Sequence, residues 1–374
     1  MKKITVLGAG RVGATMAMDL ARDGEFQVTV ADRSESALAR LAALGLATLN
    51  KDLARPEAVR EAVAGADLVV GAVPGFMGYR TMETVLGAGR NMVDISFFPE
   101  DPFQLDGLAR EKGLVAIMDA GVAPGCDNFI VGDCQREMDA ITNFECYVGG
   151  LPAIRTWPFE YKAGFSPVDV IEEYTRPARY VAHGKEIVLP ALSEPELMDF
   201  PGVGTLEAFN TDGLRSLIHT VDAPFKKEKT LRYPGHIEKM RMLREAGFFG
   251  LEPIDVGGVR IAPMDLTTRL LFPMWQMEEG DEDFTIMRVI VDGRKDDQPA
   301  RQVWDLMDRY DRATRTTSMA RTTGYTRTAT VRLVAAGLYG KPGIAPPEFV
   351  GREAGCWDFI RKDLAKRNVN WMRS

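Results

Sequence analysis

Short apolar runs alternate with segments of helical period through the first third of the chain. The runs are almost continuously apolar, which is typical of parallel strands buried on both faces. The spacing predicts six strands joined by five helical crossovers, with the last strand ending near Met118. Five strands carry the sequences ITVLG, FQVTVA, ADLVVGAV, NMVDIS and GLVAIM, and the third is a short run at residues 47–49. We therefore expect an α/β fold with a doubly wound parallel sheet, and Ser34 as the N-cap of a helix at residues 36–44.

A different pattern begins after Asp127. Runs rich in aromatic and β-branched residues predict strands of a largely antiparallel or mixed sheet. Helical spacing recurs at residues 167–174 and 236–246. The predicted strands have the sequences ITNFECYVGG, KEKTLRYPG and FTIMRVIVDGRK. The sequence thus predicts a dinucleotide-binding domain at residues 1–120 and a second, α+β domain at residues 121–317.

A long helix is predicted at residues 318–337, with the sequence SMARTTGYTRTATVRLVAAG. We expect the C-terminal segment, residues 318–374, to pack back on the first domain through this helix. Its arginines, Arg321, Arg327 and Arg332, are most simply a solvated face, because guanidinium groups are rarely buried unless they are paired.

A glycine-rich turn separates the first predicted strand from the first helix. Gly8, Gly10 and Gly13 match the G-x-G-x-x-G fingerprint, with Arg11 and Val12 between them. Gly8 permits the tight turn, Gly10 lets the backbone approach a pyrophosphate, and Gly13 lets the helix pack closely on the strand. The helix N-terminus attracts the phosphate charge. The fingerprint is weak alone, but its position between a strand and a helix predicts a bound dinucleotide.

Asp32, at the end of the second predicted strand, bears on the identity of this dinucleotide. It lies about 20 residues past the fingerprint, where such folds bind the ribose hydroxyls of adenosine. A carboxylate there accepts hydrogen bonds from a free 2′-hydroxyl and repels a 2′-phosphate. Arg33 could instead pair with that phosphate or stack on adenine. We expect NAD as the cofactor, with NADP less favoured.

Further candidate residues follow the later strands, at the edge where ligands bind in such sheets. An acidic side chain after the third strand could reach the adenine amino group. The segment AGVAPGCDN, at residues 120–128, follows the sixth strand, and its glycines and proline indicate an unusual backbone path. The remaining positions are Asp52 after the third strand, Val73 and Pro74 after the fourth, and Asp94 and Ser96 after the fifth.

Composition argues against several classes of function. The chain has 374 residues, of which 45% are hydrophobic and 26% are charged, as in ordinary globular proteins. Its net charge of −7 argues against nucleic acid or an anionic membrane surface as a partner. No apolar run approaches the length of a membrane span. The cysteines show no metal-ligand spacing, so we expect a cytoplasmic protein with reduced thiols and no bound metal.

Motifs along the chain give a more specific indication. GAGRVG, DAGVAPGCDN, LEAFNTDG, TLRYPGHIEKM and MARTTGYT occur in an order that resembles the saccharopine dehydrogenase-like family, over residues 2–351. Within that family, the resemblance is strongest to bacterial and archaeal L-lysine 6-dehydrogenases. It implies a Rossmann domain, a substrate-binding and dimerisation domain, and a homodimer. It also implies that Gly121, Val122 and Asn128 lie along the nicotinamide half of the cofactor.

The resemblance also assigns contacts to a small amine or amino-acid substrate. Ser96 and Phe97 match substrate contacts after the fifth strand, and Phe165 and Ser166 match a second pair. Arg232, in the sequence TLRY, matches an arginine of the family and could hold a single carboxylate bidentately.

Two charged contacts of the similar fungal saccharopine reductases are missing. Ala123 stands in place of an acidic residue, and Thr211 stands in place of an arginine that binds a carboxylate. A large dicarboxylate adduct would need both charges. We therefore expect NAD-dependent oxidative deamination of the ε-amino group of L-lysine, or of a closely related amine, to the semialdehyde. The alternatives are a saccharopine-type reductase that couples an amine with a carbonyl compound, and a non-catalytic NAD-binding protein.

A base is required, because a lysine ammonium with a pKa of about 10.4 must lose a proton before hydride can leave its carbon. His236 begins a predicted helix, and a helix N-terminus disfavours its protonated form. Its structural alternatives are to cap that helix or to pack on Tyr233. Asp94, Asp119 and Asp127 are also expected near enough to act as base or ammonium anchor. We predict His236 and Asp94 as the catalytic residues.

Overall fold

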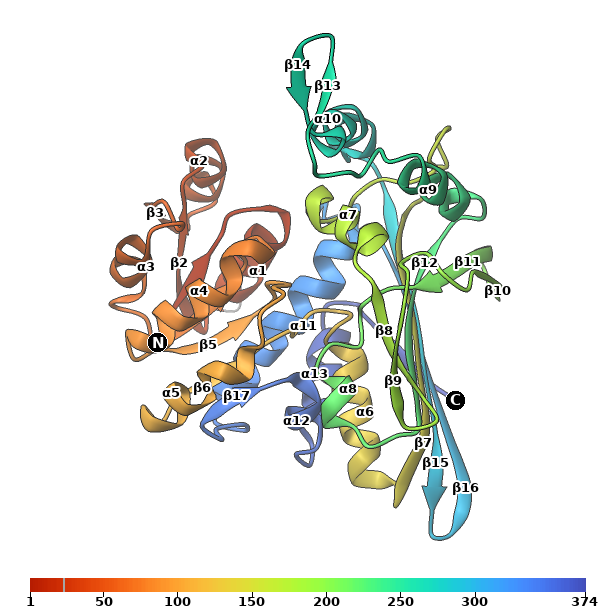
Figure 1. The fold of residues 1–374 in the computed structure, drawn as a ribbon. Coiled ribbons are helices and arrows are strands. Elements are labelled where there is room, and N and C mark those ends of the chain that lie inside the picture. The colour runs from red at the N-terminus through yellow and green to blue at the C-terminus, as the bar shows by residue number, and fades with distance from the viewer. Residues whose placement is uncertain (23) are drawn as a thin grey trace. The chain divides into compact units, whose positions relative to one another are not determined.

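The computed structural model describes residues 1–22 and 24–374. The chain divides into two compact units. The first comprises Met1–Ala140, Arg294–Gln298 and Ala320–Trp371, and the second comprises Ile141–Gly293, Pro299–Met319 and Met372–Ser374. Figure 1 gives the labels of the helices and strands.

The first unit is built on a seven-stranded sheet whose neighbouring strands are all parallel. The order β17-β6-β5-β4-β1-β2-β3 reverses between β1 and β4, and this is the switch point at which such sheets bind ligands. Six of the strands confirm the predicted doubly wound sheet. They are β1 Lys2–Leu7, β2 Phe26–Asp32, β3 Ala47–Asn50, β4 Leu68–Gly71, β5 Asn91–Asp94 and β6 Val115–Ile117.

Helical crossovers join these six strands, as the sequence pattern predicts. Ser34 caps the second helix, because its hydroxyl accepts a hydrogen bond from the N–H of Ala37 at 3.3 Å. A short 3₁₀ helix, η1 Pro102–Leu105, precedes the last crossover helix. The helices are α1 Arg11–Arg22, α2 Glu35–Ala43, α3 Pro56–Val63, α4 Gly75–Gly87 and α5 Asp106–Glu111.

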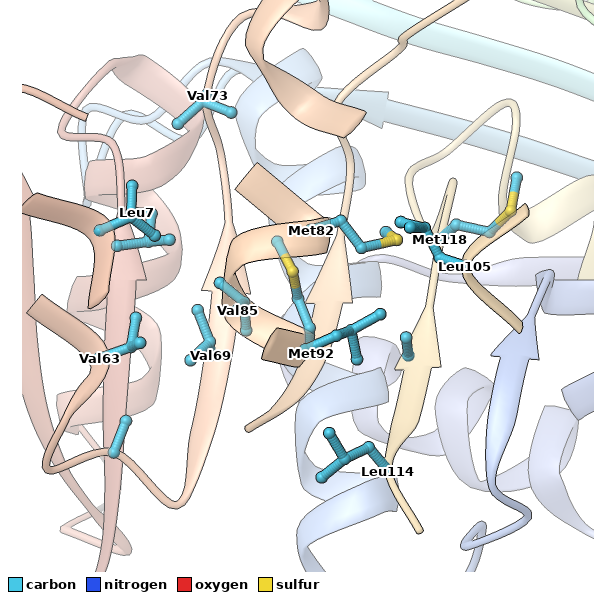
Figure 2. Close-up of a cluster of buried hydrophobic side chains, with 14 of the residues drawn as sticks. Leu7, Val63, Val69, Val73, Met82, Val85, Met92, Leu105, Leu114 and Met118 are labelled. Atoms are coloured by element: carbon cyan, nitrogen blue, oxygen red, sulfur yellow. The ribbon is translucent and has the colours of Figure 1, made fainter. Parts of the chain in front are cut away.

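A cluster of apolar side chains packs α3, α4 and α5 on one face of this sheet (Figure 2). Val69 and Met92 from the strands meet Val63 and Val85 from the helices, and all four are fully buried. Burying an aliphatic side chain contributes about 1.5–3 kcal/mol. The cluster thereby fixes the strands whose carboxyl ends carry the candidate site.

The C-terminal segment adds a seventh strand that the sequence pattern did not predict. β17 Gly343–Ala345 pairs with β6, and its three residues are too few to show an alternating pattern. α12 Pro347–Gly351 packs on α6 Cys126–Glu137 at two glycines. A Cβ at Gly132 would lie 2.3 Å from the Glu348 carbonyl oxygen, and one at Gly351 would lie 2.3 Å from that of Phe129. This close approach explains why residues 121–140 belong to the first unit, whereas the sequence pattern assigned them to the second.

The helix α11 Ser318–Ala335 corrects the expectation of a solvated arginine face. Arg321 is 4% exposed, Arg327 is 0% exposed and Arg332 is 6% exposed. The helix packs closely on α1, since a Cβ at Gly324 would lie 3.3 Å from Met16 Cγ. The expectation was wrong because this helix lies inside the first unit, where its guanidinium groups find acceptors.

The charge of Arg332 is balanced in a buried network. Arg332 Nη1 lies 2.9 Å from Asp19 Oδ2, and Arg367 Nε lies 2.6 Å from Asp19 Oδ1. Asp363 Oδ2 accepts hydrogen bonds from both arginines, at 3.4 and 3.1 Å. Burial raises the pKa of Asp19, but the two arginines and a hydrogen bond from Thr328 outweigh it and hold the pKa below its ordinary value. The network joins α1, α11 and α13 Cys356–Ala365.

The second unit is built on a nine-stranded mixed sheet, which agrees with the predicted α+β fold. Its main path is β10-β11-β12-β7-β15-β16-β18, and β8 and β9 branch from β12. β12 is parallel to β7 and antiparallel to β11 and β8. The strands are β7 Ala140–Pro152, β8 Ala178–Ala182, β9 Lys185–Leu189, β10 Glu196–Phe200, β11 Gly204–Asn210, β12 Phe225–Arg232, β15 Asp283–Lys295, β16 Gln298–Arg309 and β18 Trp371–Arg373.

An aromatic core holds the helices of the second unit. Tyr174, Met240 and Trp275, from three different helices, are fully buried in it. Asp283 on β15 accepts hydrogen bonds from the first N–H groups of α11, at Ser318 (2.6 Å) and Met319 (3.0 Å). The remaining elements are α7 Pro167–Thr175, α8 Leu217–Thr220, α9 His236–Glu245, α10 Pro263–Trp275 and the hairpin of β13 Ile254–Val256 and β14 Val259–Ile261. Within the described ranges, every helix is too short or too polar to cross a membrane.

The buried network predicts a large and pH-dependent effect of Asp19→Asn. The neutral side chain removes one of the two carboxylates that Arg332 and Arg367 share, so the free energy of unfolding should fall by about 3 kcal/mol at neutral pH. Because the pKa of Asp19 is lower in the folded protein, its stabilisation is complete above the unfolded-state pKa of about 3.9 and is lost as the pH falls further. Urea unfolding between pH 7 and pH 3 measures both effects.

Asp305→Asn is the matched control, because Asp305 pairs with Arg288 at 2.7 Å with both side chains about one-third exposed. That exposed pair should contribute less than about 1 kcal/mol. Equal losses in the two variants would contradict the importance of the buried network.

Candidate active site

The turn after β1 forms a glycine cradle. Gly8 has a φ of 118°, and a Cβ there would lie 2.4 Å from the Ala72 carbonyl oxygen. A Cβ at Gly13 would lie 2.2 Å from the Gly8 carbonyl oxygen, so both positions exclude a side chain. Gly10 is exposed, with no atom within 4 Å of its Cβ position. The turn is thus closely packed at Gly8 and Gly13 and exposed at Gly10, as a phosphate-binding turn requires.

Asp32 lies beside this cradle. One carboxylate oxygen accepts the N–H of Ala9 at 2.7 Å, and the other accepts the N–H of Ser34 at 2.7 Å. These bonds fix the carboxylate and leave lone pairs for ribose hydroxyls. Arg33 is exposed. Asp52 is also exposed and accepts the N–H of Ala54 at 3.2 Å, in the turn before α3.

Asp94 and Ser96 form a buried polar pair at the end of β5. Asp94 Oδ2 accepts the N–H of Ser96 at 2.9 Å. The Ser96 hydroxyl lies 3.0 Å from Asp94 Oδ1 and 3.0 Å from the Val73 carbonyl, and it can donate to one of them at a time. Pro74 begins α4 as its N-cap, and Phe97 is half-buried. The structure therefore brings together the predicted residues after β4 and β5.

Burial raises the pKa of Asp94 to about 6, and the charge of Asp119 adds to this effect. Arg327 and the hydrogen bonds from Ser96 act in the opposite direction. Gly71 leaves the space that the carboxylate occupies, since a Cβ there would lie 1.9 Å from Asp94 Oδ1. Asp94 is thus a carboxyl group that changes charge close to neutral pH.

The segment AGVAPGCDN folds into a tight loop before α6. The peptide bond between Ala123 and Pro124 is cis, and Gly125 has a φ of 145°. The Gly125 N–H donates to Asp127 Oδ1 and Asn128 Oδ1, both at 2.9 Å. Burial raises the pKa of Asp127 to about 7. Because Asp127 Oδ1 accepts the N–H of Gly125, the side chain of Asp127 stabilises the loop.

Asn128 and the first residues of this loop are also fixed. The amide of Asn128 donates to Glu348 Oε2 at 2.9 Å. The N–H of Gly121 lies 3.0 Å from the carbonyl oxygens of Asp119 and Pro124, and Val122 accepts the N–H of Cys126 at 2.9 Å. Gly121, Val122 and Asn128 therefore belong to one compact loop on the candidate cofactor edge.

In the second unit, His236 has both ring nitrogens engaged. Nδ1 lies 2.8 Å from the Phe159 carbonyl, which can only accept, so Nδ1 carries the proton. Nε2 then accepts the hydroxyl proton of Tyr174 at 2.9 Å. Burial, with the charge of Arg232, lowers the pKa of His236 to about 3. The histidine is neutral as expected, but its engaged lone pair weighs against a role as catalytic base.

Arg232 belongs to the same buried chain of polar groups. Its Nη2 lies 2.5 Å from Glu173 Oε2, and its Nε donates to the Tyr174 hydroxyl at 3.2 Å. Nη1 donates to the Leu231 carbonyl at 3.0 Å, and the guanidinium lies 4.4 Å from the centre of the Tyr161 ring. The predicted carboxylate receptor is thus already paired with an internal carboxylate.

Three of the other predicted substrate contacts, Phe165, Ser166 and Thr211, lie in the second unit with Arg232. Phe165 and Ser166 are half-buried and directly precede α7, which carries Glu173 and Tyr174. Thr211 is buried, and its hydroxyl lies 2.6 Å from Glu228 Oε2. The sequence carries no local motif at Glu173, Tyr174 or Arg327, because each of these side chains contacts a partner that is distant in the chain.

The residues of the first unit fit a dinucleotide. Gly10 leaves open space beside the turn, Arg11 and Val12 begin the helix, and Asp32 accepts the N–H of Ala9 in that turn, close to where the fingerprint predicts the ribose. In the part of the chain that the structure describes, no group of His, Cys, Asp and Glu side chains is arranged to hold a metal ion.

A doubly wound sheet with a glycine cradle at its switch point, followed by a mixed-sheet unit, defines a class of two-domain dinucleotide-binding proteins. Within this class, the chain belongs to the saccharopine dehydrogenase family. The model of the saccharopine dehydrogenase NADP binding domain matches residues 4–117, and that of the saccharopine dehydrogenase C-terminal domain matches residues 121–369. The family expected from the sequence motifs is confirmed.

The mitochondrial alpha-aminoadipic semialdehyde synthase of Mus musculus is 26% identical over 272 residues, which make up 67% of this chain and 29% of the synthase. Saccharopine dehydrogenase (NADP(+), L-glutamate-forming) of Pyricularia oryzae is 26% identical over 268 residues, or 67% of this chain and 59% of that protein. The matches thus span less than two thirds of these curated relatives. Apo saccharopine dehydrogenase (L-Glu forming) from Saccharomyces cerevisiae shares the fold, with a TM-score of 0.82 at 20% identity over 100% of this chain and 99% of the other.

The loop geometry predicts different effects of alanine at its two glycines. A Cβ at Gly125 would lie 2.0 Å from the Gly121 carbonyl oxygen, and its φ of 145° disfavours any side chain. A Cβ at Gly121 would lie 3.1 Å from the Pro124 carbonyl oxygen, with no positive φ. Gly125→Ala should therefore destabilise the protein by about 1–3 kcal/mol, and Gly121→Ala by less, in urea unfolding.

Gly113→Ala is the matched control, because Gly113 has a φ of 64° and open space around its Cβ position. It isolates backbone strain from the steric contact. A loss in Gly125→Ala no larger than that in Gly113→Ala would show that the loop relaxes around the added methyl group.

Proposed function

We propose that this protein is an oxidoreductase that removes the ε-amino group of L-lysine, or of a closely related amine, by NAD-dependent oxidation to the semialdehyde. The dinucleotide cradle and the family support oxidation or reduction at a carbon–nitrogen bond. The observation that carries the choice of substrate is the pairing of Arg232 with Glu173.

Because Arg232 is already paired with Glu173, the site favours a substrate with few carboxylate groups. Of the six predicted substrate contacts, only Arg232 is a cation, and Glu173 already balances part of its charge. Thr211, in place of an arginine, is hydrogen-bonded to the acidic Glu228. Several buried carboxylates would repel one another and the internal acids. A substrate with a single carboxylate, such as lysine, suits this set better than an adduct with a dicarboxylic keto acid.

Asp94 is the proposed base. Above its pKa of about 6 it is a carboxylate that can take a proton from the substrate ammonium. The glycine cradle and Asp32 would hold the nicotinamide cofactor, which would supply an acceptor for the hydride of the ε-carbon. Water then adds to the substrate imine, ammonia leaves, and the semialdehyde cyclises. His236, with both nitrogens engaged, instead holds Tyr174, which in turn holds Arg232 toward the α-carboxylate.

A saccharopine-type reaction is the second candidate, because the curated relatives carry the name saccharopine dehydrogenase or semialdehyde synthase. In that reaction an amine and a carbonyl compound are joined and the imine is reduced. The two candidates differ in their substrates, since the second requires two organic molecules.

The cofactor and the assembly are also proposals. The carboxylate of Asp32 supports NAD, although the matching family model is named for NADP. We further propose a homodimer in the cytoplasm, as the family resemblance implies, and light scattering on the purified protein tests the dimer.

The position of Asp32 predicts that NAD binds more tightly than NADP by about tenfold. Asp32→Ser should narrow this difference, because the repulsion of a 2′-phosphate is lost. Fluorescence titration with NADH and NADPH measures both affinities. Glu35→Ser is the control, since Glu35 is an exposed acid in the next helix with no bond to the cradle. Equal affinities in the unaltered protein would show that Asp32 does not select the cofactor.

Deuterium at the ε-carbon of lysine should pass to NADH, whereas deuterium at the α-carbon should remain in the product. Removing the substrate carboxylate, as in cadaverine, should raise KM, and Arg232→Lys should raise KM for lysine by about tenfold because the fork is lost. The two effects should not add, since they remove opposite ends of one contact. Mass spectrometry and steady-state kinetics measure these results. Transfer of the α-deuterium, or coupling of lysine to a keto acid without lysine oxidation, would overturn the proposal.

A further inference from the structure

Arg327 lies fully buried at the carboxyl edge of the first sheet. Its Nη1 donates to the carbonyls of Gly71 at 3.1 Å and Val93 at 2.7 Å, and its Nε donates to the carbonyl of Ala120 at 3.4 Å. These carbonyls belong to the end of β4, to β5 and to the loop after β6. One side chain therefore joins three of the segments that carry candidate residues at this edge.

Arg327 is paired differently from Arg332, a buried arginine of the same helix. Arg332 makes direct ion pairs with Asp19 and Asp363, whereas Arg327 makes none within residues 1–22 and 24–374. Its Nη2 has no hydrogen-bond partner in that part of the chain either. A neutral amide side chain could also donate to carbonyls, so hydrogen bonding alone does not explain a buried charge, which is unfavourable without compensation.

The charges that act on Arg327 explain why a cation lies there. Burial lowers the pKa of Arg327 to about 9, and Asp94 and Asp119 raise it, so the guanidinium stays protonated at neutral pH. The charged groups that act on Asp94 are Arg327 on α11 and Asp119 in the loop after β6, and they act in opposite directions. The arginine is thus the cation that balances Asp94 without contacting it directly.

We propose that Arg327 is a positioning residue for the reaction: its guanidinium fixes the ends of β4 and β5 and the loop before Gly121, and its charge keeps Asp94 available as a carboxylate. This role deepens the proposed oxidoreductase function and rests on it. The two parts of the role are separable, because lysine keeps the charge but cannot span the three carbonyls, whereas glutamine removes the charge.

The test compares Arg327→Lys and Arg327→Gln with Arg332→Lys, a buried control on the same helix that pairs with Asp19 and Asp363. ADP-ribose binding and a cooperative melting curve first establish that each variant is folded. Both Arg327 variants should lower kcat for lysine oxidation by about tenfold or more, because misplaced segments disturb the reacting geometry. Arg332→Lys should lower stability without this loss of turnover.

Infrared spectroscopy follows Asp94 without any substrate, after subtraction of the spectrum of Asp94→Asn. The midpoint of its carboxyl titration should rise by about one pH unit or more in Arg327→Gln and remain near its original value in Arg327→Lys. A midpoint that does not move in Arg327→Gln would overturn the charge role. Turnover in Arg327→Lys equal to that in Arg332→Lys would overturn the positioning role, and this comparison stands even where Arg327→Gln does not fold. An unaltered protein that oxidises no amine would refute the proposed function while leaving the infrared result to judge Arg327.

Discussion

The burial of guanidinium groups inside the first unit is the constraint on which the rest of the structure depends. A buried arginine destabilises the fold unless acceptors and counter-ions replace the water that it loses. Arg332 and Arg367 meet Asp19 and Asp363, which joins α1, α11 and α13. Arg327 meets main-chain carbonyls at the strand ends instead. These contacts hold the C-terminal segment in the first unit, so that β17 can extend the sheet beside β6.

The parallel sheet then determines which residues share an edge. Because parallel strands all end on the same side, the glycine cradle, Asp32, Asp94 and the loop before α6 emerge together without any local sequence relationship. Glycines keep this edge compact. At Gly8, Gly71 and Gly125, an added Cβ would lie 2.4 Å or less from another atom of the chain and would clash with it. Packing of this kind also excludes water, and the resulting desolvation raises the pKa of Asp94.

The sequence predicted what depends on local pattern and missed what depends on distant partners. Hydrophobic periodicity was sufficient for six strands of the first sheet and for α7 and α9, and a serine before a helical pattern was sufficient for the cap at Ser34, because each is encoded within a few residues. β17 was missed because three residues show no period. The arginines of α11 were misjudged because a guanidinium that meets Asp19 or a strand end has the same local sequence as one in water. Arg232 was identified, but its pairing with Glu173 was not, since α7 and β12 are far apart in the chain.

A comparison of Asp19 with Asp94, two of the buried aspartates of the first unit, shows how the distance to a cation determines the charge of a carboxyl group. Asp19 touches two guanidinium groups, and their charges hold its pKa below the ordinary value, so it stays ionised and structural. Asp94 is also buried near an arginine, but Arg327 donates to carbonyls rather than to this carboxylate, and burial prevails over attraction. A direct ion pair would lower the pKa of Asp94 and make the carboxylate a weaker base. If no cation were nearby, its pKa would rise, and the carboxyl group would be protonated at neutral pH. Because the strand-end carbonyls hold Arg327 without a direct ion pair to Asp94, the carboxyl keeps the intermediate pKa that suits the base that we propose.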